Sequence, residues 1–186
     1  MKKLSEYLNM LAESGLWTKD NSDSADFHAE IRDVSYNSLE AGQGTLFICK
    51  GANFKPEYLK DALQKGAAAF ICEEGSAVAA ACSTDETLHG VPHIFVNNIR
   101  RAISKISAFA FDRSWDKMKL IGVTGTKGKS TTTSMIKAIM DKYCGREIGF
   151  SSGIYTYDGK NKKKAYKLTT PETIELHHIL DNCVKN

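Results

Sequence analysis

The sequence predicts an α/β protein made of two successive units. The first observation is a β-α-β pattern: residues 45–49 and 67–72 are apolar runs, and residues 56–65 have the period of a helix, with Pro56 at its start. The second observation is a glycine-rich loop, residues 124–131, between an apolar run and an amphipathic helix. Strands that alternate with helices pack most naturally as a parallel or mixed sheet.

The remaining elements of the first unit follow from the same patterns. Apolar residues at helical spacing predict a short helix over 4–12 that stops at Gly15, and the Asp- and Ser-rich stretch 18–30 is typical of a loop. Residues 93–96 predict a third strand, and Asn98 is placed to cap a helix that continues to about residue 111. We therefore expect a compact domain over residues 1–112 and a linker over residues 113–119.

The second unit, residues 120–186, is expected to begin a nucleotide-binding domain. Predicted elements are a strand at 120–124, a helix at 129–143 ending at Gly145, two strands at 150–157 and 164–168 joined by Asp158-Gly159, and a final helix capped by Thr170 with Pro171 at its first position. A nucleotide-binding α/β domain needs several central strands to form a sheet that is buried on both faces, and this unit supplies only one or two. We therefore expect this unit to be incomplete.

Composition indicates an ordinary soluble globular protein, with 42% hydrophobic and 25% charged residues. No C-x-x-C pair occurs, so reduced thiols in a cytosolic protein are favoured over disulfides or zinc for the five cysteines, Cys49, Cys72, Cys82, Cys144 and Cys183. The N-terminus lacks the apolar core of a signal peptide, and no run reaches the roughly 20 apolar residues of a membrane span. These features predict a cytoplasmic protein that does not enter a membrane.

The net charge of +3 is unevenly distributed, because lysines concentrate in the second unit. Four of them lie at a predicted hairpin tip, where they form a solvated face or attract phosphorylated ligands: Lys160, Lys162, Lys163 and Lys164. No aromatic interleaving or groove-reading motif accompanies them, which disfavours nucleic acid as a partner. A metal site at His177 and His178 is also disfavoured, since neighbouring helical residues point about 100° apart.

The glycine-rich loop has the chemistry of a phosphate site. Its glycines allow several backbone N–H groups to face one anion, the following helix adds its positive N-terminal end, and a lysine supplies a full charge. Ser130 is placed to hold Mg²⁺. The predicted ATP-binding residues are Gly125, Thr126, Lys127, Gly128, Lys129, Ser130 and Thr131. A glycine-rich turn that binds nothing is the structural alternative.

The loop departs from the general pattern G-x-x-x-x-G-K-[ST], because Val123 stands where that pattern has its first glycine. Its own pattern, T-G-T-x-G-K-[ST], resembles the ATP loop of the Mur ligase family. Two further stretches are similar to MurE-type members of that family. Residues 34–39 and 44–47 stand where those members have a D-S-R signature followed by G-D-L-F, and residues 168–172 contain a T-T-P segment. The three matches occur in the same order and cover most of the chain.

The resemblance implies an ATP- and Mg²⁺-dependent ligase that adds the third amino acid to UDP-N-acetylmuramoyl-L-alanyl-D-glutamate through an acyl phosphate. It implies a uridine-binding first domain, with UDP-substrate contacts at Ser38, Asn53, Thr169 and Thr170. The amino acid is L-lysine or meso-diaminopimelate. The catalytic residues of the family are expected beyond Asn186, so we expect the chain alone to be inactive. The sequence does not indicate an oligomeric state.

Departures from the family pattern leave alternatives open. Asn37 and Leu39 replace the carboxylate and guanidinium of D-S-R, and a simple turn is the alternative role for Ser38. Helix capping alone can explain Thr170. Lys127 replaces the usual asparagine and adds a cation beside the phosphates. Other readings are a different Mur-type ligase (MurF, MurT or folylpolyglutamate synthetase), a non-catalytic module that binds UDP-linked precursors or ATP, and an unrelated P-loop NTPase.

Overall fold

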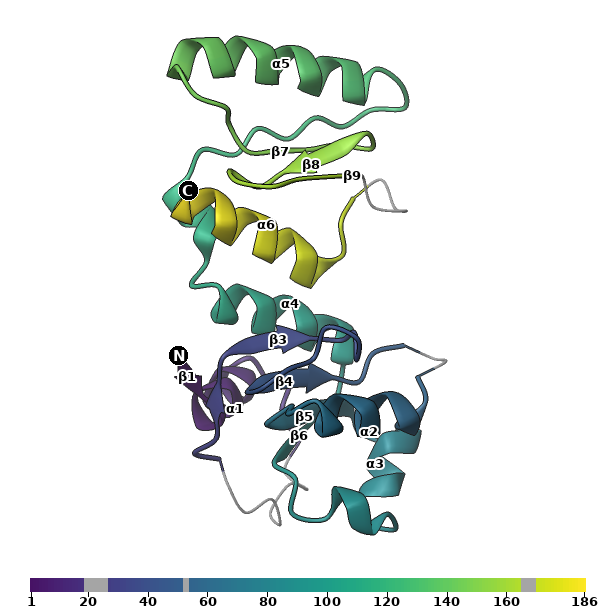
Figure 1. Cartoon of the computed structure of the whole chain (residues 1–186). Coiled ribbons are helices and arrows are strands. Elements are labelled where there is room, and N and C mark those ends of the chain that lie inside the picture. Colours follow the sequence, from purple (N-terminus) through teal and green to yellow (C-terminus); the bar gives the residue numbers. More distant parts are fainter. Residues whose placement is uncertain (19–26, 52–53, 165–169) are drawn as a thin grey trace. The chain divides into compact units, whose positions relative to one another are not determined.

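The computed structural model describes residues 1–18, 27–51, 54–164 and 170–186. The chain forms two compact units, Met1–Ala110 and Phe111–Asn186. Figure 1 shows the elements of each unit along the chain. The described residues contain no helix that is both long and apolar enough to cross a bilayer.

A four-stranded parallel sheet organises the first unit (Figure 1). Its strands, in spatial order, are β3 (Asp33–Ser35), β4 (Thr45–Ile48), β5 (Ala69–Glu73) and β6 (His93–Val96). Phe47 is in register with Phe70, and Phe70 is in register with His93. The α/β class with a parallel sheet is thus confirmed.

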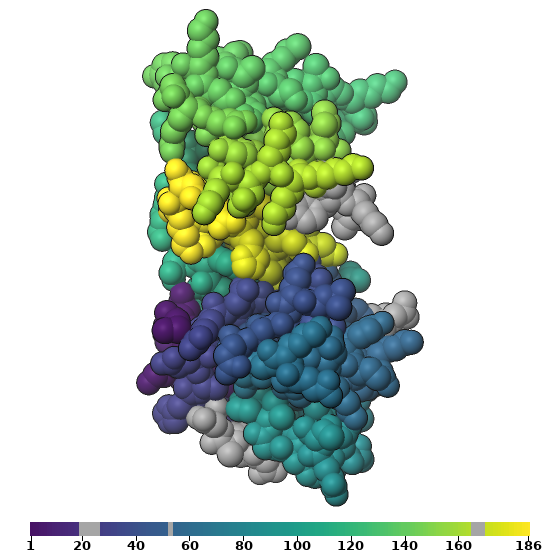
Figure 2. Space-filling model, in the orientation of Figure 1, coloured from purple at the N-terminus to yellow at the C-terminus, as the bar shows by residue number. Residues whose placement is uncertain are grey.

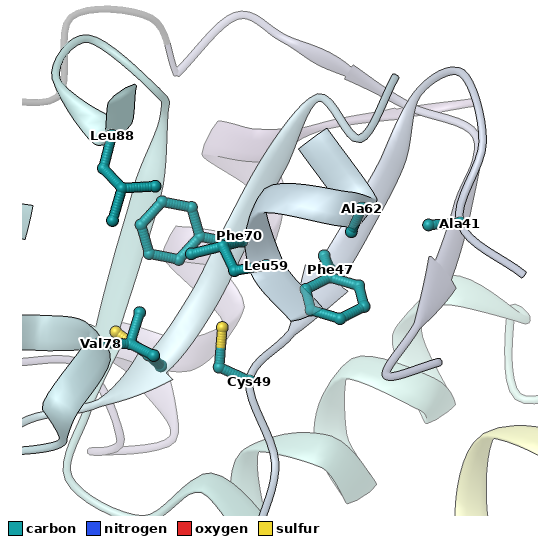
Figure 3. Close-up of a cluster of buried hydrophobic side chains, with 9 residues drawn as sticks. Ala41, Phe47, Cys49, Leu59, Ala62, Phe70, Val78 and Leu88 are labelled. Atoms are coloured by element: carbon teal, nitrogen blue, oxygen red, sulfur yellow. The ribbon is translucent and has the colours of Figure 1, made fainter. Parts of the chain in front are cut away.

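Helices cover both faces of this sheet, because the central strands are apolar on both sides. Phe47, Cys49, Phe70 and Cys72 alternate along β4, β5 and the residues that follow them, and they pack with Leu59 and Ala62 of α2 (Pro56–Gln64) and Val78 of α3 (Ala77–Cys82) (Figure 3). The other face carries Leu46, Ile48 and Ile71, all fully buried. There α4 (Ile99–Ala110) contacts both α1 (Leu4–Glu13) and β3.

Turn chemistry explains two of the helix boundaries. Asn98 caps α4, since its Oδ1 accepts the N–H of Arg101 at 2.9 Å. Gly66 ends the turn after α2 with φ +99°, and a Cβ there would lie 2.5 Å from Gln43 Oε1 and 3.1 Å from Gln43 Cα. Only glycine fits this position without moving the backbone of the 42–44 loop.

Four short elements of the first unit were not expected from the sequence. They are the antiparallel pair β1 (Lys2–Lys3) and β2 (Glu30–Ile31), the edge strand β3, and helix α3; a 3-10 turn, η1 (Glu86–Leu88), follows α3. Strands of two or three residues carry too little periodicity to be recognised. Helix α3 is alanine-rich, and Ser76 caps it by accepting the N–H of Ala79 at 3.2 Å.

The second unit combines helices with a small antiparallel sheet. It contains η2 (Ser114–Lys117), α5 (Lys129–Cys144), the strands β7 (Phe150–Ser151), β8 (Tyr155–Tyr157) and β9 (Lys162–Lys164), and α6 (Thr173–Lys185). Gly145 has φ +66° and ends α5, as predicted. Figure 2 shows the side chains of the β8–β9 hairpin extending from the surface, and every residue of β9 is exposed.

Two predictions about the second unit were wrong. Residues 120–124 belong to no strand, and Leu120 and Ile121 are 58% and 60% exposed, because no described strand pairs with them. The final helix begins at Thr173 with Glu172 as its N-cap, so Thr170 is not the cap. Glu172 is extended after Pro171 and its carbonyl accepts the N–H of Leu176 at 2.8 Å, which sets the start of the helix two residues later.

The predicted turn at Asp158-Gly159 joins two paired strands, but the bounds of those strands differ from the prediction. Asp158 Oδ1 accepts the N–H groups of Lys160 and Asn161, and Tyr157 is in register with Lys162. Residues 152–154 form an additional turn, so the run 150–157 is two strands. The predicted strand at 164–168 begins within β9, and its residues 165–168 lie outside the described part.

A buried histidine should make the second unit sensitive to pH. His177 is buried on α6, its ring centre 5.0 Å from that of Trp115 in η2. Burial, with a smaller contribution from His178, lowers the pKa of His177. The folded state therefore binds fewer protons than the unfolded state. The contribution of neutral His177 to stability is fully present above about pH 6.5 and decreases as pH falls below it.

We expect Trp115 fluorescence, measured in a Trp17→Phe background, to report a lower melting temperature at about pH 5.5 than at about pH 7.5. In a His177→Phe variant this difference should shrink. An unchanged difference would contradict His177 as its cause.

Candidate functional site

The predicted phosphate loop is a curved backbone segment at the N-terminus of α5. Gly128 is the N-cap residue, with φ +79°, and Gly125 has φ +149°. Residues 124–128 are exposed, and the first backbone N–H groups of α5 have no preceding turn to bond to. The loop therefore presents amides without a partner among the described residues, and the positive end of a 16-residue helix, to an incoming anion.

Lys129 bends back over this loop. Its Nζ donates to the carbonyl of Gly125 at 2.6 Å. Because this acceptor is a neutral backbone carbonyl, a phosphate oxygen would compete with it for the ammonium group. Lys127 is exposed in the same loop and has no ion-pair partner in the part of the chain that the structure describes. The loop thus holds two cations within three residues.

The residues at the start of α5 fit a magnesium ion that is also held by phosphates. Ser130 is half-buried, and its hydroxyl has no hydrogen-bond partner among the described residues. Those residues contain no cluster of three His, Cys, Asp or Glu side chains able to hold a metal by themselves. Mg²⁺ commonly takes one or two protein ligands and completes its shell with water and substrate phosphates. Ser130 is therefore a fitting single ligand.

A buried cation fixes α5 to the segment before β7. Lys137 is 6% exposed, and its Nζ contacts Asp141 Oδ2 at 2.6 Å and Glu147 Oε1 at 3.0 Å. Asp141 Oδ1 also accepts the N–H of Ile148 at 2.8 Å. Burial opposes the charge of Lys137, but the bonds to the two carboxylates outweigh it and raise its pKa. This network holds the helix whose N-terminus carries the loop.

We expect Lys137→Ala to lower the free energy of unfolding by about 1–3 kcal/mol, because two neighbouring carboxylates lose their shared cation. Urea unfolding at neutral pH measures this. Lys142→Ala, at an exposed position on the same helix, is the matched control and should change stability by less than about 0.5 kcal/mol. Equal losses in both variants would contradict a role for the network.

A cleft of about 540 Å³ lies in the first unit at the carboxyl ends of β4, β5 and β6. Ligands of open parallel sheets bind at this edge. The cleft is lined by Cys49, Lys50, Gly51, Phe54, Glu73, Glu74, Gly75, Ser76, Ala77, Val78, Asn98, Ile99 and Arg100. Glu73 Oε2 accepts the N–H of Ile99 at 3.3 Å, so this carboxylate is already hydrogen-bonded to the first residue of α4.

Of the four predicted UDP-substrate residues, the structure describes Ser38 and Thr170. Ser38 lies on the turn after β3, where its carbonyl accepts a hydrogen bond from Lys65 Nζ at 2.8 Å; it does not line the cleft. Thr170 is exposed before α6 in the second unit. Asn53 and Thr169 lie outside the described residues. Gly51 and Phe54, on either side of residues 52–53, line the cleft.

Most residues of the cleft were not predicted from the sequence. Lys50, Glu73 and Asn98 each follow a predicted strand by no more than two residues. Because the carboxyl ends of parallel strands meet at one edge, their positions after successive strands were the available signal.

Comparison with known proteins decides the family. Residues 123–186 match the family model of the Mur ligase middle domain. The whole chain is 33% identical, over 191 residues, to the UDP-N-acetylmuramoyl-L-alanyl-D-glutamate–L-lysine ligase of Streptococcus pneumoniae serotype 4, covering 37% of that protein. The same-named ligase of Enterococcus faecalis is 35% identical over 158 residues, which are 84% of this chain and 29% of that one. The chain belongs to the Mur ligase family.

The fold of this Mur ligase chain resembles that of a solved family member. A UDP-N-acetylmuramoylalanyl-D-glutamyl-2,6-diaminopimelate–D-alanyl-D-alanyl ligase from Acinetobacter baumannii aligns with 97% of the chain and 33% of its own length, with a TM-score of 0.53 and 18% identity. The likeness concerns the fold. This chain spans about 37% of the length of the Streptococcus ligase.

Proposed function

We propose that the chain provides the uridine-binding domain and the beginning of the ATP-binding domain of a ligase that adds the third amino acid to UDP-N-acetylmuramoyl-L-alanyl-D-glutamate in peptidoglycan precursor synthesis. For the chain itself the proposal is binding of ATP and of the UDP-linked precursor in the cytoplasm. Amide-bond formation is proposed for the whole ligase, because the chain spans only 37% of such a relative. The proposed domains are residues 1–112 and 120–186.

The loop geometry carries the ATP part of the proposal. Unpaired amides, the N-terminus of α5 and Lys129 converge at residues 125–131. A triphosphate is the nucleotide group that such a site recognises. We assign ATP contacts to Gly125, Thr126, Lys127, Gly128, Lys129, Ser130 and Thr131, with Ser130 also as a ligand of Mg²⁺. The bound ion would neutralise charge on the phosphates.

The proposed reaction brings two anions together. A carboxylate oxygen of the precursor attacks the γ-phosphorus of ATP, the bond to ADP breaks, and an acyl phosphate forms. The amine of the incoming amino acid then attacks the acyl carbon, phosphate leaves, and an amide remains. Positive charge from Lys129 and the loop amides offsets the repulsion in the first step. The groups that bind the amine are assigned to no residue of this chain.

The cleft of the first unit is the proposed site for the uridine diphosphate end of the precursor. Phe54 offers an aromatic surface for a base, while Lys50 and Arg100 offer cations for phosphates. Ser38, Asn53, Thr169 and Thr170 remain proposed substrate contacts from the family pattern. L-lysine is the proposed amino acid because it appears in the names of the relatives from Streptococcus and Enterococcus.

Separate calorimetric titrations test this function. Mg·ATP and UDP-N-acetylmuramoyl-L-alanyl-D-glutamate should each bind, and an Arg100→Ala variant should lose affinity for the precursor but not for ATP. Lys105→Ala, on a later turn of α4, is the matched control. Binding of neither ligand would reject the proposal, and precursor binding without ATP binding would favour a module that only recognises the precursor.

A further inference from the structure

The hairpin of β8 and β9 carries a group of lysines that the proposed function leaves unused. Lys162, Lys163 and Lys164 form β9, Lys160 lies in the turn before it, and all four side chains are exposed (Figure 2). None of the four has an ion-pair partner among the described residues. Their charge is therefore available to an anionic ligand.

The acidic side chains of the second unit do not offset this charge. Residues 120–186 contain 11 lysines and arginines but only six aspartates and glutamates. Four of the six are already engaged within the described part of the chain: Asp141 and Glu147 with Lys137, Asp181 with Lys185, and Asp158 with the backbone N–H groups of Lys160 and Asn161. An excess of one sign of charge attracts ligands of the opposite sign from a distance.

Strand pairing places two of the lysines on the face of the sheet that is turned towards α5. Residues in register in an antiparallel pair point to the same face, so Lys164 lies with Tyr155, and Lys162 lies with Tyr157. Lys137 Nζ of α5 lies 5.6 Å from the centre of the Tyr157 ring, which identifies the face. On the same face, Lys162 Nζ lies 4.1 Å from the centre of the Tyr155 ring.

One end of this hairpin lies beside the predicted phosphate loop. A Cβ built on Gly153, in the turn before β8, would lie 4.0 Å from Ser130 Oγ at the start of α5. Tyr155 begins β8 two residues later, and Lys164 is its partner across the strand pair. Strand spacings therefore place the Cα of Lys164 on the order of 10 Å from Gly153, and that of Lys162 about 7 Å farther along β9.

The tip of the hairpin lies at the other end of α5. A Cβ built on Gly159 would lie 3.2 Å from Asn186 Cβ, and Arg146 Nη1, just past the end of α5, donates to the Asn186 carbonyl at 3.5 Å. Since α5 has 16 residues, about 24 Å separate its two ends. Lys160, next to Gly159, is thus the lysine of the hairpin farthest from the loop, and it provides a matched comparison for Lys164.

We propose that β9 is a capture surface for the phosphate loop: Lys164, and more weakly Lys162, attract the phosphates of Mg·ATP and raise its association rate, while the loop makes the final contacts. This inference rests on the proposed binding of ATP at residues 125–131. The charges act beyond contact distance, because the screening length is about 30 Å at 0.01 M salt and about 10 Å at 0.1 M. A capture surface therefore changes the association rate constant and leaves the dissociation rate constant unchanged.

Stopped-flow fluorescence of the full chain separates the two rate constants, with Mg·ATP that carries a methylanthraniloyl group on its ribose as the probe. At about 0.01 M salt we expect Lys164→Glu to lower the association rate constant by about 5–10-fold and Lys160→Glu by less than about 2-fold. Lys164→Arg keeps the charge and should retain the rate of the parent chain. At about 0.5 M salt all four proteins should associate at the same rate, because the charges are screened.

The outcomes distinguish the capture surface from ATP binding itself. Equal losses in Lys160→Glu and Lys164→Glu, or an unchanged association rate in Lys164→Glu at low salt, would overturn the capture surface and leave the loop as the nucleotide site. Faster dissociation of Lys164→Glu that persists at high salt would make this lysine a direct ligand, which also overturns the proposal. If the parent chain bound no nucleotide, the proposed function and the capture surface would both be rejected.

Discussion

Lys129→Ala should weaken binding of Mg·ATP by about 10–100-fold or more, because it removes a charge-assisted hydrogen bond to the phosphates. The side chain is already held at the loop by the carbonyl of Gly125, so little ordering is needed when a phosphate replaces that acceptor. Calorimetric titration of the variant and the parent protein gives the ratio of the two dissociation constants. Affinity for the UDP-linked precursor should not change.

Lys142→Ala is the matched control for this prediction. It removes the same charge from the last turn of the same helix, where the peptide dipole no longer attracts an anion. A fall in affinity of less than about 2-fold is expected for it. If both variants lost affinity equally, general charge and not the loop would account for ATP binding. Unchanged affinity in Lys129→Ala would remove this lysine from the site.

Phe47→Ala should lower the free energy of unfolding by about 3–5 kcal/mol, the largest stability change that we expect in the first unit. Its side chain is fully buried between the sheet and α2, is in register with Phe70, and has its ring centre 6.1 Å from that of Phe54. Truncation leaves a cavity that the surrounding strands cannot close. Urea unfolding followed by circular dichroism measures the change.

Leu39→Ala provides the comparison for the core variant, because Leu39 is 81% exposed and its truncation should cost less than about 0.5 kcal/mol. Since Phe54 lines the cleft, Phe47→Ala should also weaken binding of the UDP-linked precursor. Stability of the variant within about 1 kcal/mol of the parent protein would contradict the packing of this core.

The sequence predicted those elements whose boundaries are set by local chemistry. Residues 93–96 form β6 as expected, Asn98 caps α4, and glycines stand at both ends of α5. Such signals act within a few residues, so they can be read before the tertiary structure is known. Helix α3 was missed because six small residues give little periodicity and rely on contact with β5 and α2.

Elements that depend on distant partners were not predictable in the same way. Residues 120–124 have the composition of a buried strand, but a strand needs neighbours to satisfy its backbone, and none of the described strands pairs with it. The exposed side chains of Met135, Ile139 and Tyr143 on α5 have the same cause, since a stripe at helical spacing finds nothing to cover it within the described residues.

The candidate site shows the same division between local and distant signals. The predicted phosphate loop is continuous in sequence, so its seven residues could be proposed from the sequence alone, and the structure describes each of them. The cleft joins residues that follow three different strands, and only the sheet order brings Lys50, Glu73 and Asn98 together. Ser38, named from the family pattern, accepts a hydrogen bond from Lys65 through its carbonyl and does not line that cleft.

Nuclear magnetic resonance of the ¹⁵N-labelled chain, titrated with Mg·ATP, tests the central claim most directly, because it observes each loop amide separately. We predict that the largest shifts belong to the backbone N–H signals of residues 125–131 and that Lys129→Ala reduces them. The claim would be contradicted if these signals stayed in place at saturating nucleotide, or if the largest shifts fell on the lysine-rich strand β9 instead.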